Sequence, residues 1–184
     1  LACTHIIPFT TWDIRNRQPG LFTCYDPAAL IAQVKEAKGQ CDVLFVMLHW
    51  GFESKTRPET YESGLGHSLI DAGADAVIGT HPHSLQGIEY YNGKPIFFSL
   101  GDFIFDDEID QTMLLKAGLD PKSKELSYSL IPAYAAGAVT NLATESEDAG
   151  KADAVFETVR SASENAEISP EGVLTEKGAA AAGE

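Results

Sequence analysis

The stretches DVLFVMLHW, residues 42–50, and ADAVIGTHPH, residues 74–83, are two apolar runs that are each followed directly or closely by histidine. A continuous apolar run without alternation is typical of a strand that is buried on both faces of a sheet. In open α/β sheets, ligands bind in the crevice at the carboxyl ends of the strands. We therefore expect His49, His81 and His83 to meet at that edge, with a stiff proline turn between the last two.

The sequence around these runs alternates between strand and helix signals. Asp26 before Pro27 is a typical helix start, Gly73 is a typical helix end, and Asn92-Gly93 is a strong hairpin turn signal. This order of elements indicates an α/β (α+β) fold with a mixed sheet. The predicted elements are a strand at 1–7, a loop at 8–26, helices at 27–39, 59–72 and 149–165, strands at 43–48, 76–79, 111–117 and 125–133, and a hairpin at 85–91 and 95–100.

The overall charge narrows the possible classes of function. The chain carries 27 acidic and 13 basic residues, for a formal net charge of −14. A nucleic-acid binder normally has a basic face, so we exclude nucleic acid as a partner. No long apolar run occurs, so we expect no transmembrane segment in this chain. Cys3, Cys24 and Cys41 share no Cys-x-x-Cys spacing, which indicates buried thiols rather than a disulfide framework or a zinc site.

Three of the five histidines follow predicted strands, and this grouping predicts a metal site. Taken alone, a histidine at a strand end is more often a structural hydrogen-bond partner than a ligand. Together, His49, His81 and His83 favour metal binding and a metal-dependent hydrolase. The sequence has no Gly-x-Ser-x-Gly nucleophile motif and no Gly-rich phosphate loop, so a serine or cysteine nucleophile is a weak alternative.

The carboxylates near these histidines each have more than one interpretation. Asp102 either completes the site or serves as a turn residue or helix cap. Glu53, four residues after His49, is a partner of the ligands, an acid or base group, or a solvated loop charge. The acidic run at 106–108 is interpreted as solvated surface.

Three further residues are interpreted as structural or left open. His67 is predicted to face the sheet from its helix and to be structural rather than a ligand. His5 has no partner that the sequence identifies. Trp50 either lines the rim of a pocket or fills the core.

The run from Asp42 to Phe105 resembles the C-terminal half of the bacterial capsule-synthesis proteins of the poly-γ-glutamate (CapA/PgsA) type, which are relatives of the calcineurin-like metallophosphoesterases. Several spaced motifs in one order carry this resemblance. They are Leu48-His49-Trp50-Gly51 with Glu53 and Pro58, His67 before Leu69-Ile70-Asp71-Ala72-Gly73-Ala74-Asp75, Val77-Ile78-Gly79, His81-Pro82-His83, Gln86, Glu89, Tyr91, Gly93-Lys94-Pro95-Ile96, and Ser99-Leu100-Gly101-Asp102-Phe103.

The resemblance implies a fold and a chemistry. The implied fold is an αββα sandwich of the metallophosphoesterase type, whose members hold two divalent metal ions, commonly Mn, Fe, Zn or Mg. His49 and His81 are implied ligands of one ion and His83 of the other, with Glu53 and Asp102 as catalytic or supporting carboxylates. The implied function is hydrolysis of a phosphoester or amide by metal-activated water in surface-polymer metabolism. The alternative is a non-enzymatic accessory subunit of a membrane-bound poly-γ-glutamate synthase or export complex.

The resemblance also implies partners and a location. The implied partner is poly-γ-glutamate, a related anionic polymer, or the synthase complex that makes it. The implied location is the cell surface or another extracytoplasmic site, with membrane association through an N-terminal segment absent here.

This chain departs from the family pattern in two ways. Asp102 stands where the family usually has Asn, and the early Gly-Asp and Asn-His motifs of the family have no counterpart before residue 42. We therefore expect an incomplete sandwich, with 1–140 as the C-terminal portion of the domain and 141–184 as its C-terminal helix and a flexible tail. Because a two-metal centre needs a bridging carboxylate from the absent half, we expect weak or no hydrolysis from this chain alone.

Overall fold

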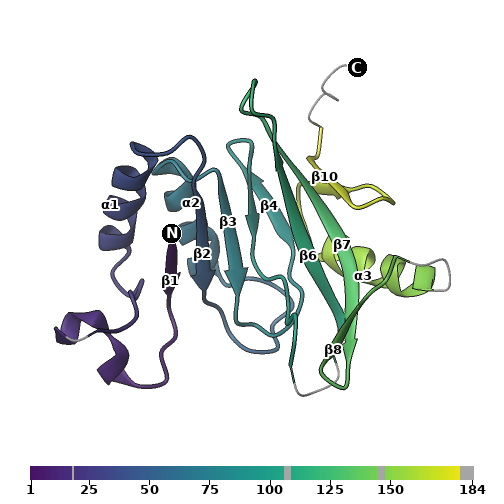
Figure 1. Ribbon diagram of the computed structural model, residues 1–184, viewed down its shortest axis with the longest axis horizontal. Coiled ribbons are helices and arrows are strands. Elements are labelled where there is room, and N and C mark those ends of the chain that lie inside the picture. The colour runs from purple at the N-terminus through teal and green to yellow at the C-terminus, as the bar shows by residue number, and fades with distance from the viewer. Residues whose placement is uncertain (18, 106–108, 145–147, 179–184) are drawn as a thin grey trace.

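The structure is a computed structural model that describes residues 1–17, 19–105, 109–144 and 148–178 (Figure 1). The chain is a mixed α/β protein with two sheets, as the sequence predicts. One sheet has the strand order β1-β2-β3-β5-β4, and the other has the order β6-β7-β10-β9 with β8 added beside β7. The elements are β1 (Ala2–Thr4), η1 (Thr10–Trp12), η2 (Ile14–Asn16), α1 (Pro27–Lys38), β2 (Phe45–His49), α2 (Thr60–Asp71), β3 (Ala76–Thr80), β4 (Ile88–Tyr91), β5 (Lys94–Phe97), β6 (Ile109–Leu119), β7 (Leu126–Ala136), β8 (Val139–Leu142), α3 (Ala149–Ala162), β9 (Ala166–Ile168) and β10 (Val173–Glu176).

The first sheet forms the parallel part of the fold. Strands β1, β2, β3 and β5 run parallel, and β4 turns back antiparallel to β5. Helices α1 and α2 pack on one face of this sheet, and their apolar side chains join those of β2, β3 and β5 in one core. The carboxyl ends of β2 and β3 therefore lie side by side at one edge of the sheet (Figure 1).

Local signals in the sequence act as predicted in this half. The Asp26 side chain accepts a hydrogen bond of 3.1 Å from the Ala28 amide and caps α1. Strands β4 and β5 are joined at Asn92 and Gly93, whose φ angles of 50° and 73° are those that a tight hairpin turn requires. The hairpin is shorter than predicted at both ends, because regular pairing runs only from Ile88 to Phe97.

Strand β2 differs from the prediction of a strand buried on both faces. Val46 and Leu48 are buried beneath the helices, whereas Met47 on the opposite face is 50% exposed. The second sheet covers that opposite face around β5, where the rings of Phe97 and Tyr128 are 5.7 Å apart, and Met47 lies beyond this cover. The prediction was wrong here because an apolar run does not show how far a covering layer extends.

The second sheet is antiparallel and is built around β7. Strand β7 pairs with β6, β8 and β10, and α3 packs against β6 and β7. The sequence predicted β6, β7 and α3. Its apolar pattern places Ala154, Val155 and Val159 on the buried side of α3, but Ala154 is exposed and Phe156 is buried beside Val155 and Val159. Strands β8, β9 and β10 were not predicted. The chain after β7 therefore contains three short strands in addition to the predicted helix. The flexible tail is expected from about residue 177; residues 177 and 178 form a turn, and 179–184 lie outside the described residues.

Candidate metal centre

The carboxyl ends of β2 and β3 bring two of the predicted histidines together. His49 is the last residue of β2 and is paired in register with Thr80, the last residue of β3. His81 follows directly, and the centroid of its ring lies 4.6 Å from that of His49. The Nδ1 atom of His49 lies 3.4 Å from the Thr80 hydroxyl oxygen, which helps to orient the His49 ring.

The turn that carries His81 and His83 has an unusual backbone. The φ angle is 104° at His81 and 57° at His83, in the region that residues with a side chain rarely adopt. Pro82 between them is buried, and the two imidazole centroids are 5.6 Å apart. Strained backbone of this kind persists at functional sites, where the surrounding structure holds it in place. The strain is therefore physical support for a functional role of this turn.

Hydrogen bonds from the same turn hold the loop that carries Glu53. The Ser54 amide donates to the Pro82 carbonyl over 2.8 Å. The Lys55 carbonyl accepts a hydrogen bond of 3.0 Å from the side-chain amide of Gln86. Although Glu53 is exposed, the backbone that follows it is tied to the histidine turn at two points.

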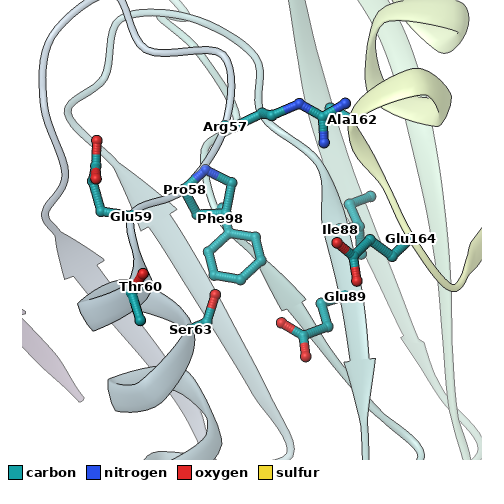
Figure 2. Close-up of a pocket in the computed structure, with 10 residues that line it drawn as sticks. All are labelled: Arg57, Pro58, Glu59, Thr60, Ser63, Ile88, Glu89, Phe98, Ala162 and Glu164. Carbon is teal, nitrogen blue, oxygen red and sulfur yellow. The ribbon is translucent and has the colours of Figure 1, made fainter.

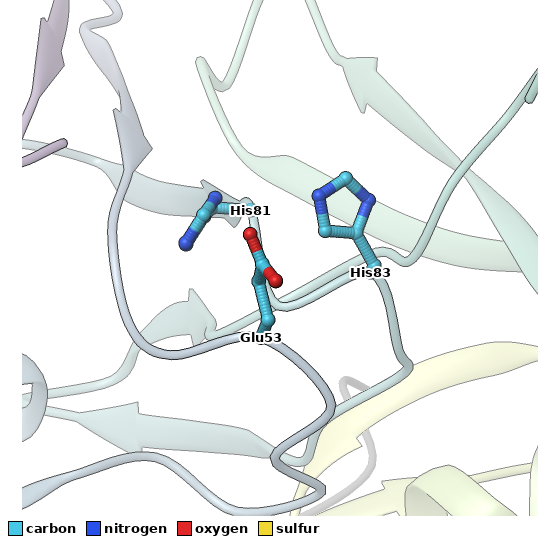
Figure 3. Close-up of side chains that lie close together, drawn as sticks. All are labelled: Glu53, His81 and His83. Carbon is cyan, nitrogen blue, oxygen red and sulfur yellow. The ribbon is translucent and has the colours of Figure 1, made fainter. Parts of the chain in front are cut away.

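Glu53, His81 and His83 form a group whose geometry fits one metal ion (Figure 3). Each offers a ligand atom, and these atoms all lie within 4.8 Å of one another. Figure 3 shows the Glu53 carboxylate between the two rings. Ligand atoms about 2.1 Å from a tetrahedral zinc ion are about 3.4 Å apart, so small side-chain rotations suffice to close the group on an ion. Two imidazoles and one carboxylate, with a further position open, are the donor set of a catalytic zinc site.

This group differs from the ligand set that the family resemblance implies. The Glu53 carboxylate lies within 4.8 Å of ring nitrogens of His81 and His83, so it could itself be a metal ligand. The resemblance implied instead that Glu53 is a catalytic or supporting group. His49 lies beside His81 but outside the group of three. The roles of His49 as a ligand, and of Glu53 and Asp102 as catalytic groups, stay predictions.

Asp102 holds the ring of His83. The Nδ1 atom of His83 lies 2.8 Å and 2.9 Å from the two carboxylate oxygens of Asp102. This bond occupies Nδ1 and leaves Nε2 of His83 for a metal ion. A carboxylate partner also raises the basicity of the imidazole, so Asp in place of the expected Asn would strengthen the binding of an ion by His83.

Partial desolvation by the surrounding protein favours the neutral form of His49 and His81, although His49 is exposed and His81 is half-buried. Burial, and then the nearby charge of His83, lower the pKa of His49 below its ordinary value. The pKa of His81 is lowered mainly by burial and, to a smaller extent, by the nearby charges of His49 and His83. The negative charge of Glu53 raises this pKa, but its effect is smaller. A lowered pKa leaves the imidazole lone pair free near neutral pH, and this is the form that binds metal.

Two other residues from the sequence analysis have structural roles. The Nε2 atom of His67 lies 2.6 Å from the Glu89 carboxylate, and its ring stacks on Tyr91. This agrees with the structural role predicted for His67. Trp50 is completely buried, and its indole N–H donates to the Phe98 carbonyl over 2.9 Å, so Trp50 fills the core rather than a pocket rim.

His5, the three cysteines and the acidic run at 106–108 remain from the sequence analysis. The ring of His5 contacts two tyrosine rings, which are the partners that the sequence did not identify. Cys3 and Cys24 are buried thiols as predicted, whereas Cys41 is exposed. The acidic run at 106–108 lies outside the described residues.

A family model described as bacterial capsule synthesis protein PGA_cap matches residues 7–107, which is more than half of the chain. The chain belongs to the PGA_cap family. The match confirms the family that the motifs between Asp42 and Phe105 indicate. It also includes the group of three and both Asp102 and His49, so the candidate metal centre lies within the PGA_cap part of the chain.

Curated relatives of this PGA_cap chain agree with the family match. The PGA biosynthesis protein CapA of Bacillus subtilis is 42% identical over 92 residues, which is 50% of this chain and 24% of the relative. The capsule biosynthesis protein CapA of Bacillus anthracis is 40% identical over 95 residues, 50% of this chain and 23% of the relative. A probable polyglutamine synthesis accessory protein of Mycobacterium tuberculosis is 36% identical over 104 residues, 53% of this chain and 27% of the relative. The chain thus spans about a quarter of the length of these relatives.

A buried carboxylate beside the centre was missed by sequence reasoning. Glu62 is completely buried, and its Oε2 accepts a hydrogen bond of 2.7 Å from the Glu59 amide. Its Oε1 has no hydrogen-bond partner among the described residues, and a Cβ added at Gly51 would lie 2.8 Å from it. Burial raises the pKa of Glu62, against the opposing effect of the Glu59 hydrogen bond. The only sequence signal is the Glu59-x-x-Glu62 spacing, a weak form of the capping box.

The Glu62→Gln variant is expected to be more stable than the wild type by about 1 kcal/mol near pH 8 and nearly equal to it near pH 4. The folded-state pKa of Glu62 lies above its ordinary value of 4.5, so burial of the charge costs nothing below that pH and more as the pH rises. Urea unfolding at the two pH values checks this, with the exposed Glu157→Gln as the matched control. An equal effect at both pH values would contradict the assignment.

Proposed function

We propose that this chain carries part of the metal centre of a hydrolase that acts on a surface polymer. The convergence of Glu53, His81 and His83 at the carboxyl edge of the sheet carries the proposal. A divalent ion held there would act as a Lewis acid and lower the pKa of a bound water, which is the chemistry that hydrolysis of a phosphoester or amide needs. Two imidazoles and a carboxylate suit Zn, Fe or Mn better than Mg, which prefers oxygen ligands.

Each residue of the centre has its own part in this proposal. Glu53 supplies negative charge, and His81 supplies a neutral imidazole because its pKa is lowered. Asp102 orients His83, so that Nε2 is presented to the ion. His49, 4.6 Å from His81, is the residue that we propose as a ligand of a second ion in the complete domain.

The proposal extends to the whole domain. We propose that the complete protein is an αββα sandwich of the metallophosphoesterase type, in which residues 1–140 form the C-terminal portion and 141–184 the C-terminal end. The two packed sheets and the helices α1 and α2 on one outer face support this arrangement.

Poly-γ-glutamate or a related anionic polymer is the proposed substrate or product, and its synthase complex is the proposed partner. The names of the Bacillus relatives, which refer to PGA and capsule biosynthesis, support this. We propose a cell-surface or other extracytoplasmic location. Within the described part of the chain, none of the helices combines the length and apolar character needed to span a bilayer.

A second candidate function is a non-enzymatic accessory role in polymer synthesis. The observation that favours it is the name of the Mycobacterium tuberculosis relative, a probable polyglutamine synthesis accessory protein. In this case the metal site would be structural, and the chain would act by contact with other components of the synthesis machinery.

An assay of hydrolysis separates the two functions. We expect the chain loaded with Zn²⁺ or Mn²⁺ to cleave p-nitrophenyl phosphate or a γ-glutamyl anilide slowly. The Asp102→Ala variant should lower this rate about 10- to 100-fold, since a residue that orients a metal ligand typically has an effect of this size. The exposed Glu157→Gln is the control and should leave the rate unchanged. Because this chain carries only part of the centre, the same assay is run on the full-length protein, and a metal-loaded full-length protein that cleaves neither substrate contradicts the hydrolase and leaves the accessory role.

A further inference from the structure

A cavity of about 400 Å³ lies between the start of α2, strand β4 and the end of α3 (Figure 2). Its floor is apolar, because Phe98 and Ile88 line it and are almost completely buried. None of the three residues of the metal centre lines this cavity. Small-molecule sites have this size and combine apolar walls with a few fixed polar groups. The polar lining consists of Arg57, Glu59, Thr60, Ser63, Glu89 and Glu164.

Two carboxylates lie next to each other on the wall formed by β4 and the segment after α3. The backbone on either side of Glu89 is hydrogen-bonded to the side chains on either side of Glu164, which holds the two glutamates side by side. Figure 2 shows both carboxylates directed toward the space beside Phe98. The bonds are Ile88 N to Ser163 Oγ at 2.8 Å, Tyr90 N to Asn165 Oδ1 at 2.8 Å, and Asn165 Nδ2 to Tyr90 O at 2.7 Å.

This arrangement favours a positively charged ligand. Like charges held close together repel one another, and a cation between them removes the repulsion. His67 engages one oxygen of Glu89 at 2.6 Å. Among the residues that the structure describes, no hydrogen bond or ion pair engages the Glu164 carboxylate. Glu164 is therefore free to bind a ligand.

Arg57 places a positive charge in the cavity, at the end that lies away from the Glu89 carboxylate. Its Nη2 donates to the Ser161 carbonyl over 3.2 Å, which ties the side chain to the end of α3. A guanidinium has five N–H donors in a planar fork, so this one bond leaves donors for a carboxylate. In Figure 2 the Arg57 side chain lies across one end of the cavity, away from the Glu89 carboxylate.

We propose that this cavity binds a basic α-amino acid, with its ammonium groups at Glu89 and Glu164 and its carboxylate at Arg57. The lining carries one positive side chain, Arg57, and three negative ones, Glu59, Glu89 and Glu164, for a net charge of −2. This excess favours a ligand with two ammonium groups and one carboxylate over a neutral or acidic amino acid. A bare metal ion would use the carboxylates but neither Arg57 nor the apolar floor. The site is separate from the metal centre and does not rest on the proposed hydrolase.

Calorimetric titration of the chain with L-lysine tests the proposal. We expect a dissociation constant of roughly 0.1–1 mM, as is usual for a ligand of this size. Arg57→Gln and Glu164→Gln should each weaken lysine binding about tenfold, because each removes a charge-assisted hydrogen bond. Both residues are exposed, so neither change should disturb folding, and melting curves check this. The matched control is Glu167→Gln on β9, an exposed glutamate that does not line the cavity.

The ligand series makes the result specific. 1,5-Diaminopentane is lysine without its carboxylate, so its weaker binding should not fall further in Arg57→Gln. L-Glutamate should bind much less well than L-lysine. Failure of L-lysine to bind at roughly 20 mM would overturn the proposal. So would equal affinity in the wild type and both variants, which would place lysine elsewhere. Displacement of lysine by Ca²⁺ without any effect of Arg57→Gln would assign a metal site instead.

Discussion

The purified chain is expected to bind about one Zn²⁺ ion, and the His81→Ala/His83→Ala double variant is expected to lose it. The two imidazoles are two of the three ligand atoms that lie within 4.8 Å of one another. The four ligands of a structural zinc site together supply about 10–16 kcal/mol, so the loss of two should weaken binding by roughly a thousandfold or more. Elemental analysis of the dialysed proteins, followed by competition with a chelating dye, measures the ion content and the affinity.

A matched control separates loss of a ligand from loss of any imidazole. His67→Ala also removes a partly buried histidine, but His67 is bonded to Glu89 and stacks on Tyr91 away from the centre. Its metal content should equal that of the wild type. Equal metal content in the wild type and the His81→Ala/His83→Ala variant would show that the group of three does not hold the ion.

Two single variants decide which third residue completes the site. If Glu53 is the third ligand, Glu53→Gln should weaken Zn²⁺ binding about tenfold or more, while His49→Gln should have a smaller effect. If the ligand set implied by the resemblance is right, the order of these two effects reverses. The two variants therefore decide whether Glu53 or His49 is the third ligand, and the two substitutions change side chains of similar size.

Strong local signals made much of the fold predictable. The start of α1 follows from Asp26 and Pro27, and the β4–β5 hairpin follows from Asn92-Gly93, because each signal acts within a few residues. Strands β8, β9 and β10 are three or four residues long and depend on β7, or on each other, for pairing. No short-range pattern reports such partners, and for this reason these strands were missed.

In the candidate site, too, the residues placed by local sequence signals were predictable, and the residue placed by a contact distant in the sequence was not. His49, His81 and His83 could be placed at one edge because parallel strands end there in register. The position of Glu53 depends on the bond from Ser54 to Pro82, which joins segments about thirty residues apart in the chain. Sequence spacing therefore found the histidines but left the role of Glu53 open among several interpretations.

The Gly79→Ala variant is expected to lose about 3 kcal/mol or more of its free energy of unfolding. A Cβ at Gly79 would lie 2.0 Å from the Phe98 carbonyl oxygen and 2.3 Å from Nε1 of Trp50. These two atoms form a buried hydrogen bond of 2.9 Å, so the methyl group would push them apart and leave both without a partner. Urea unfolding measures the loss. Because His81 follows two residues later, affinity for Zn²⁺ should fall as well.

Gly64→Ala is the control that isolates this steric effect. Gly64 lies within α2, and a Cβ there would meet no atom within 4 Å. Alanine favours a helix over glycine by about 1 kcal/mol, so this variant should gain stability and keep its Zn²⁺ affinity. A Gly79→Ala protein within about 0.5 kcal/mol of the wild type would mean that β3 and β5 move apart easily at this point. In that case the buried hydrogen bond between Trp50 and Phe98 would not hold the histidine turn rigidly in place.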